Sequence, residues 1–355
     1  MNYNISRRGL MGGAAAVAAM GMLPHRARAA TVFRYGNAGG PQTVSNTFNA
    51  AFSDAMSEKT GGEISFEIFA GTLGGEKDLI ESMALGSLDI YNGAYTGTDE
   101  FDILYSPYFF RDAEHAKAVM ASEIGAKASE ALSAKYDSKL LGVGRLGSYN
   151  LMIKEPIETL ADLKGRKIRA PQIKGCIEAL NFFGAIPTPI PFNEVYLSLQ
   201  SGIVDGVLTA LNPAVQFKFY EVCKHVVVPD FGLALDKEVI SNAAWGSMSA
   251  EQQEILEDLT KIIQREMNLS WDIDHGARVQ RALLPATPEP PAGYSLGTCF
   301  YPASGLSGDF YELGTTAAGQ LRITVGDAMG KGIGPGLVAS AVHTAFVNTG
   351  WEAGP

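Results

Sequence analysis

The sequence predicts an α/β protein with two lobes and a long helix, followed by a smaller α+β segment. Three observations predict it: short apolar strands alternate with helical patterns over residues 31–208, this alternation occurs twice, and the composition changes after Trp271. Alternating strands and helices are typical of a mostly parallel sheet with helices on both faces. The chain has 355 residues, 46% of them apolar, which is long enough for two or three folding units.

Residues 1–30 have the pattern of a twin-arginine export signal. Arg7 and Arg8 precede an apolar run at 12–23, and Ala27-Arg28-Ala29 is a small-x-small cleavage site. A buried N-terminal helix is the alternative, but adjacent arginines before such a run have no packing role. The signal contains four of the 28 basic residues and none of the 38 acidic ones, so the remaining chain carries a net charge of −14. We therefore expect an acidic periplasmic protein.

The first lobe is expected at residues 31–147. Its pattern predicts, in order, a strand at 32–35, a helix at 48–56, a strand at 64–69, a helix at 76–85 and a strand at 88–91. Ligands of such sheets bind at the carboxyl ends of the strands. Asn37 and residues 92–96, which follow the first and third strands, therefore lie on candidate binding loops.

The second lobe is expected at residues 148–227, after which the chain crosses back. The predicted elements around and within it are strands at 140–143 and 151–153, a strand at 167–170, a helix at 174–183, a helix at 194–201 and a strand at 204–208. A long helix follows at 249–271, where Ser249 and Gln252 form a capping pattern before an apolar stripe. We expect this helix to brace both lobes and the cleft between the lobes to hold a small ligand.

Several classes of function do not fit the composition. Asp and Glu outnumber Lys and Arg, so nucleic-acid binding is not expected, and no stretch after the signal reaches the roughly 18 apolar residues of a membrane helix. Cys176, Cys223 and Cys299 lie far apart, which predicts packed free thiols rather than a zinc site or a disulfide framework. Residues 142–147 match the GxGxxG string of dinucleotide-binding folds, but a strand follows them instead of the required helix.

Two arginines near predicted strand ends are candidate ligands for an anion. Arg169 ends the strand at 167–170, and a guanidinium at the carboxyl end of a strand is a bidentate partner for a carboxylate. A solvated surface arginine is an equally good interpretation of the spacing alone. Arg145, which follows the strand at 140–143, is a similar candidate with weaker support.

A series of ordered segments shows a resemblance to a known family. The segments are Leu73-Gly74-Gly75-Glu76, Gly86-Ser87-Leu88-Asp89, Leu104 to Phe110, Ala161 to Pro171, Gly184 to Pro189, Asn193 to Gly202, Val204-Asp205-Gly206 and Phe219 to Val222. Through them residues 31–275 resemble the periplasmic solute-binding protein of tripartite ATP-independent periplasmic (TRAP) transporters. The resemblance implies a two-lobed protein, not an enzyme and without a cofactor, that closes around an organic acid and passes it to the membrane permease.

The resemblance also implies a set of binding residues. In the family, the arginine of the K-I-R-x-P strand forms a salt bridge with the ligand carboxylate, which implies this role for Arg169. By position, the residues that would also line the cleft are Arg145, Asn37, Phe192 and Thr209. Residues 207–210 depart from the more polar stretch that the family often has there, so fewer polar groups are expected opposite the anchor.

The tail, residues 276–355, has a different pattern. A proline-rich stretch at 285–291 precedes strands predicted at 294–301, 308–313 and 321–325. Asp309 and Asp327 each follow a glycine at a strand end, where carboxylates suit Mg²⁺ or Mn²⁺. Turn aspartates are the alternative interpretation.

Residues 277–350 are similar to the start of a SpoIIE/RsbU-like protein phosphatase of the PP2C class. The similarity lies in Val279 to Pro285, Tyr301-Pro302-Ala303, Gly308 to Glu312 and Gly326 to Gly332. It implies that Asp309, Asp327 and the carbonyl of Ala328 hold metal and that metal-bound water attacks a phosphoserine. The family continues with further strands and another metal-binding aspartate, so a truncated fragment without turnover is expected.

The two resemblances imply different compartments. Phosphatases of this family act on cytoplasmic regulators, whereas the export signal and the binding protein belong outside the cytoplasm. A natural bifunctional protein, a joined pair of gene fragments and an engineered chimera all fit the sequence, and a joined pair fits best. We therefore predict a binding protein as the main function, with a metal-dependent phosphatase as the alternative.

Overall fold

The computed structural model describes residues 30–227, 232–283, 295–300, 307–315, 321–331 and residue 339. The chain divides into two compact units, Met1–Met267 and Asn268–Pro355, and each is described by itself. The predicted export signal at 1–30 lies outside the described residues except for Ala30. Within the described part, no helix is both long enough and apolar enough to cross a membrane.

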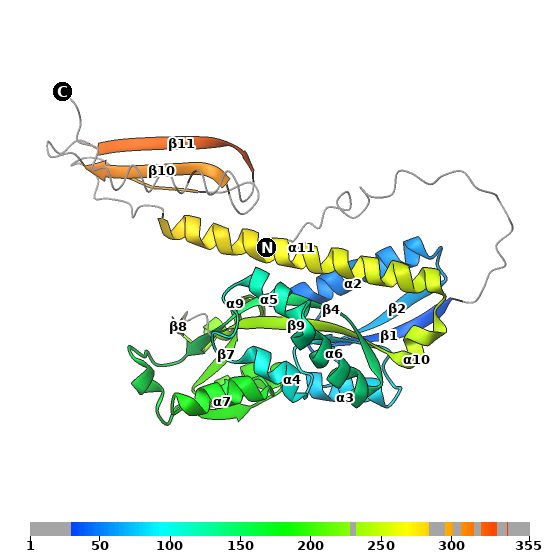
Figure 1. Ribbon diagram of the computed structural model, residues 1–355. Coiled ribbons are helices and arrows are strands. Elements are labelled where there is room, and N and C mark those ends of the chain that lie inside the picture. The colour runs from blue at the N-terminus through cyan, green and yellow to red at the C-terminus, as the bar shows by residue number, and fades with distance from the viewer. Residues whose placement is uncertain are drawn as a thin grey trace. The chain divides into compact units, whose positions relative to one another are not determined.

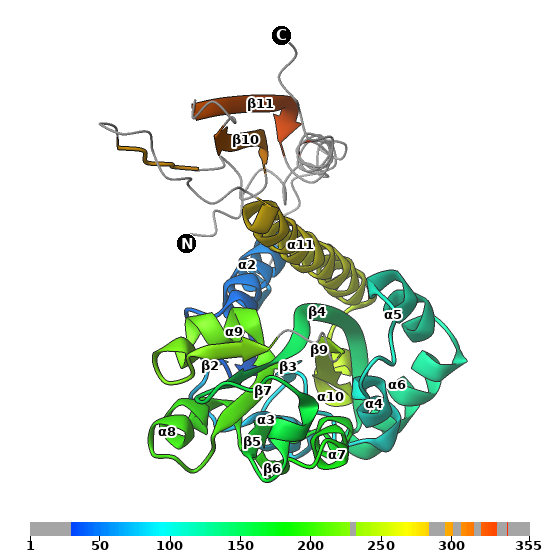
Figure 2. The same ribbon diagram turned by 90° about the vertical axis from the view of Figure 1, so that its left-hand side faces the viewer.

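The first unit is built on a sheet whose described strands run in the order β2-β1-β3-β9-β4-β7-β5-β6, with β8 paired to β4 (Figures 1 and 2). These strands are β1 (Thr31–Asn37), β2 (Ile64–Ala70), β3 (Ile90–Gly93), β4 (Ser138–Ile153), β5 (Lys167–Ala170), β6 (Ile186–Pro189), β7 (Gly206–Ala210), β8 (His225–Val227) and β9 (Leu233–Ser241). β1 pairs in parallel with β2 and β3, and β5 pairs in parallel with β6 and β7. Each lobe therefore has its own parallel sheet, as predicted.

The two parallel sheets are joined by β4 and β9, which run antiparallel to their neighbours. Residues 138–148 of β4 pair with β9, whereas residues 149–153 pair with β7. The partner of β4 thus changes between Ser148 and Tyr149. The two separate strands predicted at 140–143 and 151–153 are one strand of 16 residues, so that prediction is wrong. Three glycines between positions 142 and 147 interrupt its apolar pattern, although they lie inside the strand.

Helices cover both faces of the sheet (Figure 2). In chain order they are α2 (Val44–Lys59), α3 (Glu76–Ala84), α4 (Asp99–Asp102), α5 (Ala113–Met120), α6 (Glu123–Tyr136), α7 (Lys174–Phe182), α8 (Val195–Gln200), α9 (Leu211–Gln216), α10 (Asn242–Ser247) and α11 (Ala250–Leu283). Phe48, Phe52 and Met56 recur every four residues, so they form one apolar face of α2 and pack on β1 and β2. The rings of Phe52 and Phe66 lie 5.5 Å apart at their centroids.

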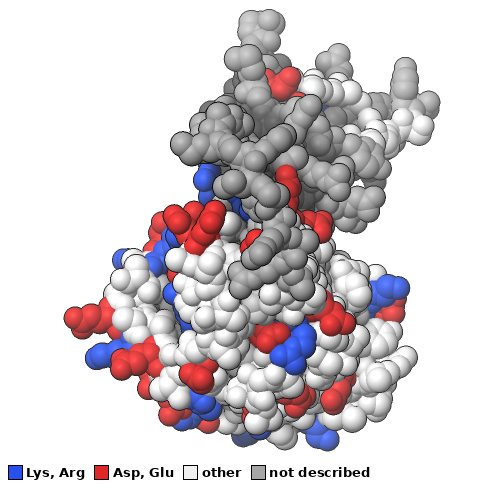
Figure 3. Space-filling view, turned by 90° about the vertical axis from the view of Figure 1, so that its right-hand side faces the viewer, with Lys and Arg blue, Asp and Glu red and all other residues white. Residues whose placement is uncertain are grey.

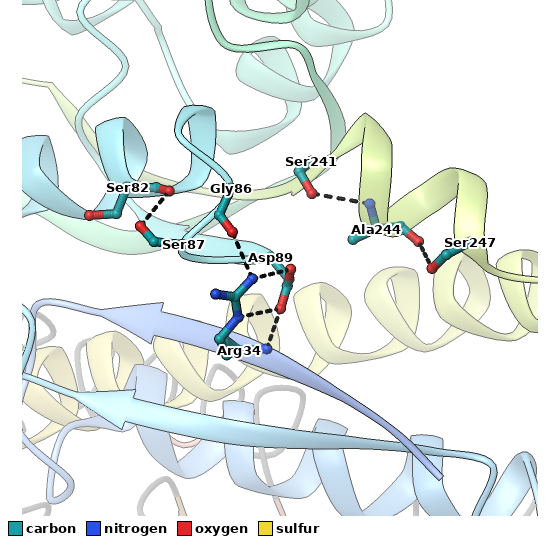
Figure 4. Close-up of polar contacts among 8 residues, drawn as sticks. All are labelled: Arg34, Ser82, Gly86, Ser87, Asp89, Ser241, Ala244 and Ser247. Atoms are coloured by element: carbon teal, nitrogen blue, oxygen red, sulfur yellow. Dashed lines mark hydrogen bonds and ion pairs between the residues drawn. The ribbon is translucent and has the colours of Figure 1, made fainter. Parts of the chain in front are cut away.

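An ion pair fixes the first strand to the segment before the third (Figure 4). Nε and Nη2 of Arg34 donate to the two carboxylate oxygens of Asp89, each at 2.9 Å, and the backbone N–H of Arg34 donates to Asp89 Oδ2 at 2.7 Å. Nη2 also donates to the carbonyl of Gly86. A bidentate arrangement of this kind fixes geometry as well as charge.

The capping pattern predicted for the long helix is confirmed, but the helix is longer than expected. The Gln252 N–H donates to Ser249 Oγ, and the Ser249 N–H donates to Gln252 Oε1. α11 extends to Leu283 instead of ending at residue 271, and its residues beyond Met267 belong to the second unit. In the first unit, Leu256, Leu259 and Ile263 pack with the core of the first lobe, and Figure 1 shows this part beside α2.

The described part of the second unit contains the antiparallel strands β10 (Ser307–Thr315) and β11 (Leu321–Lys331). Both lie at predicted strands, but residues 295–300 form no strand, which contradicts the strand predicted at 294–301. A Cβ on Gly326 would come within 2.1 Å of the Phe310 ring, so only glycine allows this close approach. Cys176 and Cys223 are buried free thiols as predicted, whereas Cys299 is exposed, contrary to the prediction.

Candidate functional site

A cavity of about 90 Å³ lies where the two lobes of the first unit meet. Its walls come from strand ends and from the segments that follow them, in agreement with the general position of ligand sites in parallel sheets. The lining residues are Asn37, Ala38, Gly39, Thr43, Val44, Ser45, Glu76, Ala94, Leu146, Tyr149, Arg169, Pro171, Phe192, Thr209, Ala210, Asn212, Pro213, Gln216, Ala234 and Asp236.

Arg169 lies on β5 with its side chain buried in the wall of this cavity, 4% exposed. Its Nε donates to the carbonyl of Ile190 at 2.9 Å and its Nη1 donates to the carbonyl of Leu208 at 3.4 Å. The guanidinium carbon lies 5.5 Å from the centroid of the Phe192 ring. Burial lowers the pKa of Arg169 to about 10, so the group remains positively charged at neutral pH. Within the described residues it forms no ion pair with a carboxylate.

Asn37, Phe192 and Thr209, which the resemblance implied as lining residues, line the same cavity. Asn37 also organises the loop after β1, because its Nδ2 donates to Oδ1 of Asn92 at 2.7 Å and its Oδ1 accepts from the Gly39 N–H at 2.7 Å. Phe192 and Thr209 come from the second lobe. The walls therefore combine residues from both lobes.

Arg145 is buried in β4, but it is not among the residues that line the cavity. In the ladder it lies opposite Leu235, whereas the lining residues Ala234 and Asp236 are the neighbours of Leu235 on β9. Because successive side chains of a strand point to opposite faces, Arg145 is assigned to the face that the cavity does not use. The register of β4 shifts directly after Arg145, and sequence periodicity gave no sign of that shift.

Several polar lining residues were not proposed from the sequence, and Glu76, Tyr149 and Asp236 are among them. Glu76 begins α3 and accepts backbone hydrogen bonds from Ala94 at 3.3 Å and Tyr95 at 2.9 Å. Burial raises the pKa of Tyr149 well above its usual value, so its hydroxyl stays protonated and able to donate. The sequence did contain a feature that could have pointed to Asp236, because residues 236–238 are three consecutive charged residues in a mostly apolar strand.

Asp236 is a buried carboxylic acid, 4% exposed. Ser45 Oγ donates to its Oδ2 at 3.3 Å. Burial, together with the nearby charge of Glu76, raises the pKa of Asp236 to about 7. The next residue, Lys237, is fully buried and its ammonium donates to the carbonyl of Ala94 and the hydroxyl of Tyr105. The ammonium of Lys237 is therefore held by other acceptors.

In the second unit, Asp309 and Asp327 lie directly opposite each other on β10 and β11, and both are exposed. Ala328, whose carbonyl was expected to join them, follows Asp327 on β11. Within the part of the chain that the structure describes, no group of three or more His, Cys, Asp or Glu side chains is placed to hold a metal ion. Among the described residues of this unit, two opposed carboxylates are thus found where the metal site was predicted, and they do not by themselves support a metal site.

Two α/β lobes that share their central strands and enclose one cavity define the class of the solute-binding proteins. Residues 36–280 match the family described as bacterial extracellular solute-binding protein, family 7 (DctP). The chain belongs to this family, whose members bind and carry solutes and are not enzymes. The match covers residues 36–267 of the first unit and continues along α11 to residue 280.

Similar proteins have been characterised in other bacteria. The sialic acid-binding periplasmic protein SiaP of Vibrio cholerae is 26% identical, over 64% of this chain and 73% of that protein. Two TRAP periplasmic solute-binding proteins have similar structures, each with a TM-score of 0.64. The one from Xanthobacter autotrophicus holds β-D-galacturonate, is 28% identical, and the match covers 70% of this chain and 86% of that chain. The one from Roseobacter denitrificans holds L-galactonate, is 27% identical, and the match covers 67% and 80%.

Not every relative is matched over its whole length. The chain spans 63% of the sequence of this same Roseobacter denitrificans protein, at 31% identity, and 64% of a solute-binding protein from a Sulfitobacter strain, at 30% identity. The membership of the family thus rests mainly on the first unit, which contains most of the matched residues.

Proposed function

We propose that the chain is the periplasmic binding component of a TRAP transporter and that it captures a sugar acid through the carboxylate. The supporting observation is Arg169, a buried guanidinium in the cavity wall with two carbonyl acceptors and no carboxylate partner among the described residues. A ligand carboxylate supplies the missing negative charge. The acids named in the two related complexes, galacturonate and galactonate, belong to this class.

The binding step follows from the cost of burying charge. A buried guanidinium without a counter-ion has lost most of its hydration, and a bound carboxylate replaces that loss with short, charge-assisted hydrogen bonds. Phe192 lies beside the guanidinium and excludes water from it. The hydroxyl of Tyr149 and the polar group of Thr209 line the same cavity and are available to the ligand oxygens. Arg145 is not part of this proposal, because it does not line the cavity.

Closure of the lobes is the second step. Arg169, Phe192 and Thr209 belong to the second lobe, whereas Asn37 belongs to the first. A ligand that contacts both walls binds more tightly to the closed arrangement and so shifts the population toward it. The strands β4 and β9, which both lobes share, are the elements that must bend for this motion.

Export and delivery complete the proposal. We infer a twin-arginine signal at residues 1–30, a periplasmic location and a TRAP permease as the membrane partner, supported by the sequence pattern and the family. On the face in Figure 3, Asp and Glu are interspersed with Lys and Arg, so long-range attraction of an anion is weak there. Local positive charge near the cavity is then the main attraction for the acid.

For residues 276–355 we propose a PP2C-like fragment without turnover. The register that places Asp309 opposite Asp327 favours this idea over two unrelated turn aspartates. Two carboxylates and the Ala328 carbonyl suit a Mg²⁺ or Mn²⁺ ion that keeps most of its waters. With the other described residues of this segment they form no larger acidic cluster of the kind that a hydrolytic metal site needs, so we derive no catalytic step from them.

A thermal-shift screen tests the binding proposal. The chain without its signal is heated with a panel of carboxylic acids, with galactonate and galacturonate among them and no added metal. We expect these acids to raise the melting temperature, because a ligand at 100 times its Kd stabilises the native state by about 2.7 kcal/mol. Galactose, which lacks the carboxylate, serves as the control. A panel in which no acid shifts the transition would contradict the proposal.

A further inference from the structure

Two acidic side chains line the cavity together with the proposed anchor. Glu76 begins α3 and Asp236 lies on β9, so both come from the first lobe, while Arg169 comes from the second. An anion site with one guanidinium and two carboxylic side chains is unusual, because each carboxylate reduces the attraction for an anion. The acidic pair therefore points to a function of its own.

The carboxyl group of Asp236 is available to a ligand. Ser45 donates to Oδ2, and the ammonium of the adjacent Lys237 is directed to the carbonyl of Ala94 and the hydroxyl of Tyr105. Among the described residues, Asp236 has no ion pair with a basic side chain. A buried carboxylate with so few partners gains most from a ligand that donates hydrogen bonds.

The carboxylate of Glu76 is held in place by hydrogen bonds from the backbone. Each of its carboxylate oxygens accepts one backbone N–H, from Ala94 and from Tyr95. These two bonds hold the carboxylate at the cavity wall, and a carboxylate still has lone pairs left to accept hydroxyl groups. Glu76 and Asp236 thus form an acceptor wall, and Arg169 with Tyr149 forms a donor wall.

We propose that Asp236, supported by Glu76, makes the site selective for monocarboxylates with hydroxyl groups at the remote end, against dicarboxylates of equal length. This inference rests on the proposed function, because it requires that Arg169 holds the carboxylate. The ligand then spans the lobes, with its carboxylate at the second lobe and its hydroxyl end at the first. A second carboxylate in the ligand meets two acceptors and no unpaired cation in the acceptor wall.

Electrostatics sets the direction of the selectivity. Like charges brought together in a buried interface repel strongly enough to suppress the wrong partner. A hydroxyl at the same place donates to the carboxylate of Asp236 and so satisfies a buried acceptor. Discrimination thus comes from an attractive contact with one ligand and from a repulsive contact with the other.

Matched ligand pairs test the inference. The pairs are galactonate with galactarate, glucuronate with glucarate, and erythronate with tartrate, so that within each pair the chain length is constant. Affinities of the full chain without its signal are measured by calorimetry at pH 8, above the pKa of about 7 of Asp236. We expect at least a roughly tenfold preference for the monocarboxylate within each pair that binds.

Variants of β9 identify the residue responsible. Asp236→Asn removes the charge and should lower the preference at least about tenfold, mainly through tighter binding of the dicarboxylate. Asp236→Glu keeps the charge and should keep the preference. Glu238→Gln is the matched control, because Glu238 lies on the same strand and does not line the binding cavity, although both Glu238 and Asp236 line a second cavity. The melting curve of each variant shows that it is folded.

The outcomes separate this inference from the proposed function. Equal affinity of wild type for both members of a pair, or an unchanged preference in Asp236→Asn, overturns the inference. The proposed function stands in that case if monocarboxylate binding still depends on Arg169. If none of these ligands binds, the proposed function is overturned, and this inference with it.

Discussion

At the scale of single residues, the charged side chains of β9 are the most unusual feature of the protein: Asp236 and Lys237 are buried and Glu238 is half-buried. Asp236, Lys237 and Glu238 follow one another in a strand whose other side chains are mostly apolar. Burial raises the pKa of Glu238 to about 8 and lowers that of Lys237 to about 8. Such groups cost stability in the folded state, so they are retained where they serve a site or a specific arrangement.

The pH dependence of stability tests the burial of Glu238. Its pKa is raised in the folded chain, so the folded state binds this proton more tightly than the unfolded state does. The resulting cost is absent below the unfolded pKa of about 4.5, grows as the pH rises, and is complete above about 8. Glu238→Gln should therefore raise the free energy of unfolding by at least about 1 kcal/mol at pH 8.5 and by much less at pH 4.5.

Urea denaturation at the two pH values measures this difference. Glu67→Gln, at an exposed position on β2, is the matched control and should change stability little at either pH. An equal effect of Glu238→Gln at pH 4.5 and pH 8.5 would show that the carboxyl group does not titrate differently in the folded chain.

At the scale of elements, β4 is the strand on which the two-lobed arrangement depends. Its ladder with β9 is irregular between Arg145 and Gly147, directly before its partner changes to β7. Gly147 has φ +127°, a backbone conformation that side chains with a Cβ rarely adopt. The glycine thus permits the irregularity that redirects the strand into the second lobe.

Substitution of this glycine should weaken the fold. We predict that Gly147→Ala lowers the free energy of unfolding by about 1–3 kcal/mol, the usual cost of backbone strain at such a position. Gly246→Ala is the control, because Gly246 lies in α10 and its Cβ would meet no atom within 4 Å. The control should be neutral or stabilising by up to about 1 kcal/mol in the same denaturation experiment. A loss in Gly147→Ala no greater than in the control would contradict this role of β4.

At the scale of the whole molecule, the sequence predicted the α/β class, the order of most elements and four residues of the cavity wall. Alternating apolar patterns and strand-end positions sufficed for Asn37, Arg169 and the parallel strands, because these features are local. The sequence did not predict that β4 is one continuous strand. Its glycines weaken the strand pattern locally, but hydrogen bonding to β9 keeps them in the strand. Arg145 was placed at the cavity from its position after the predicted strand at 140–143 and from the family resemblance, and neither shows which face of β4 its side chain occupies.

The acceptor wall was missed for a different reason. Glu76 and Asp236 are 160 positions apart in the chain, and only the tertiary fold brings them to one cavity. The sequence contained a sign of buried charge at 236–238, but no local pattern shows which face of a central strand meets a ligand. Local sequence periodicity therefore does not predict a binding site whose residues come from distant parts of the chain.

The division into units predicts that binding does not need the tail. All lining residues of the cavity fall between positions 37 and 236, inside the first unit. A chain that ends at Leu283, where α11 ends, should bind galactonate with the affinity of the longer chain. Calorimetry of the two chains side by side checks this prediction. A loss of binding on removal of residues 284–355 would show that the tail contributes to the site.

The central claim is that Arg169 holds the carboxylate of the ligand, and calorimetric titration of Arg169→Ala with galactonate tests it most directly. The account predicts a loss of at least about 2 kcal/mol in binding free energy, because the ligand carboxylate would be buried without its partner. Arg166→Ala, three positions earlier and outside the cavity lining, is the matched control and should bind as the wild type does. An affinity of Arg169→Ala equal to that of the wild type would contradict the account.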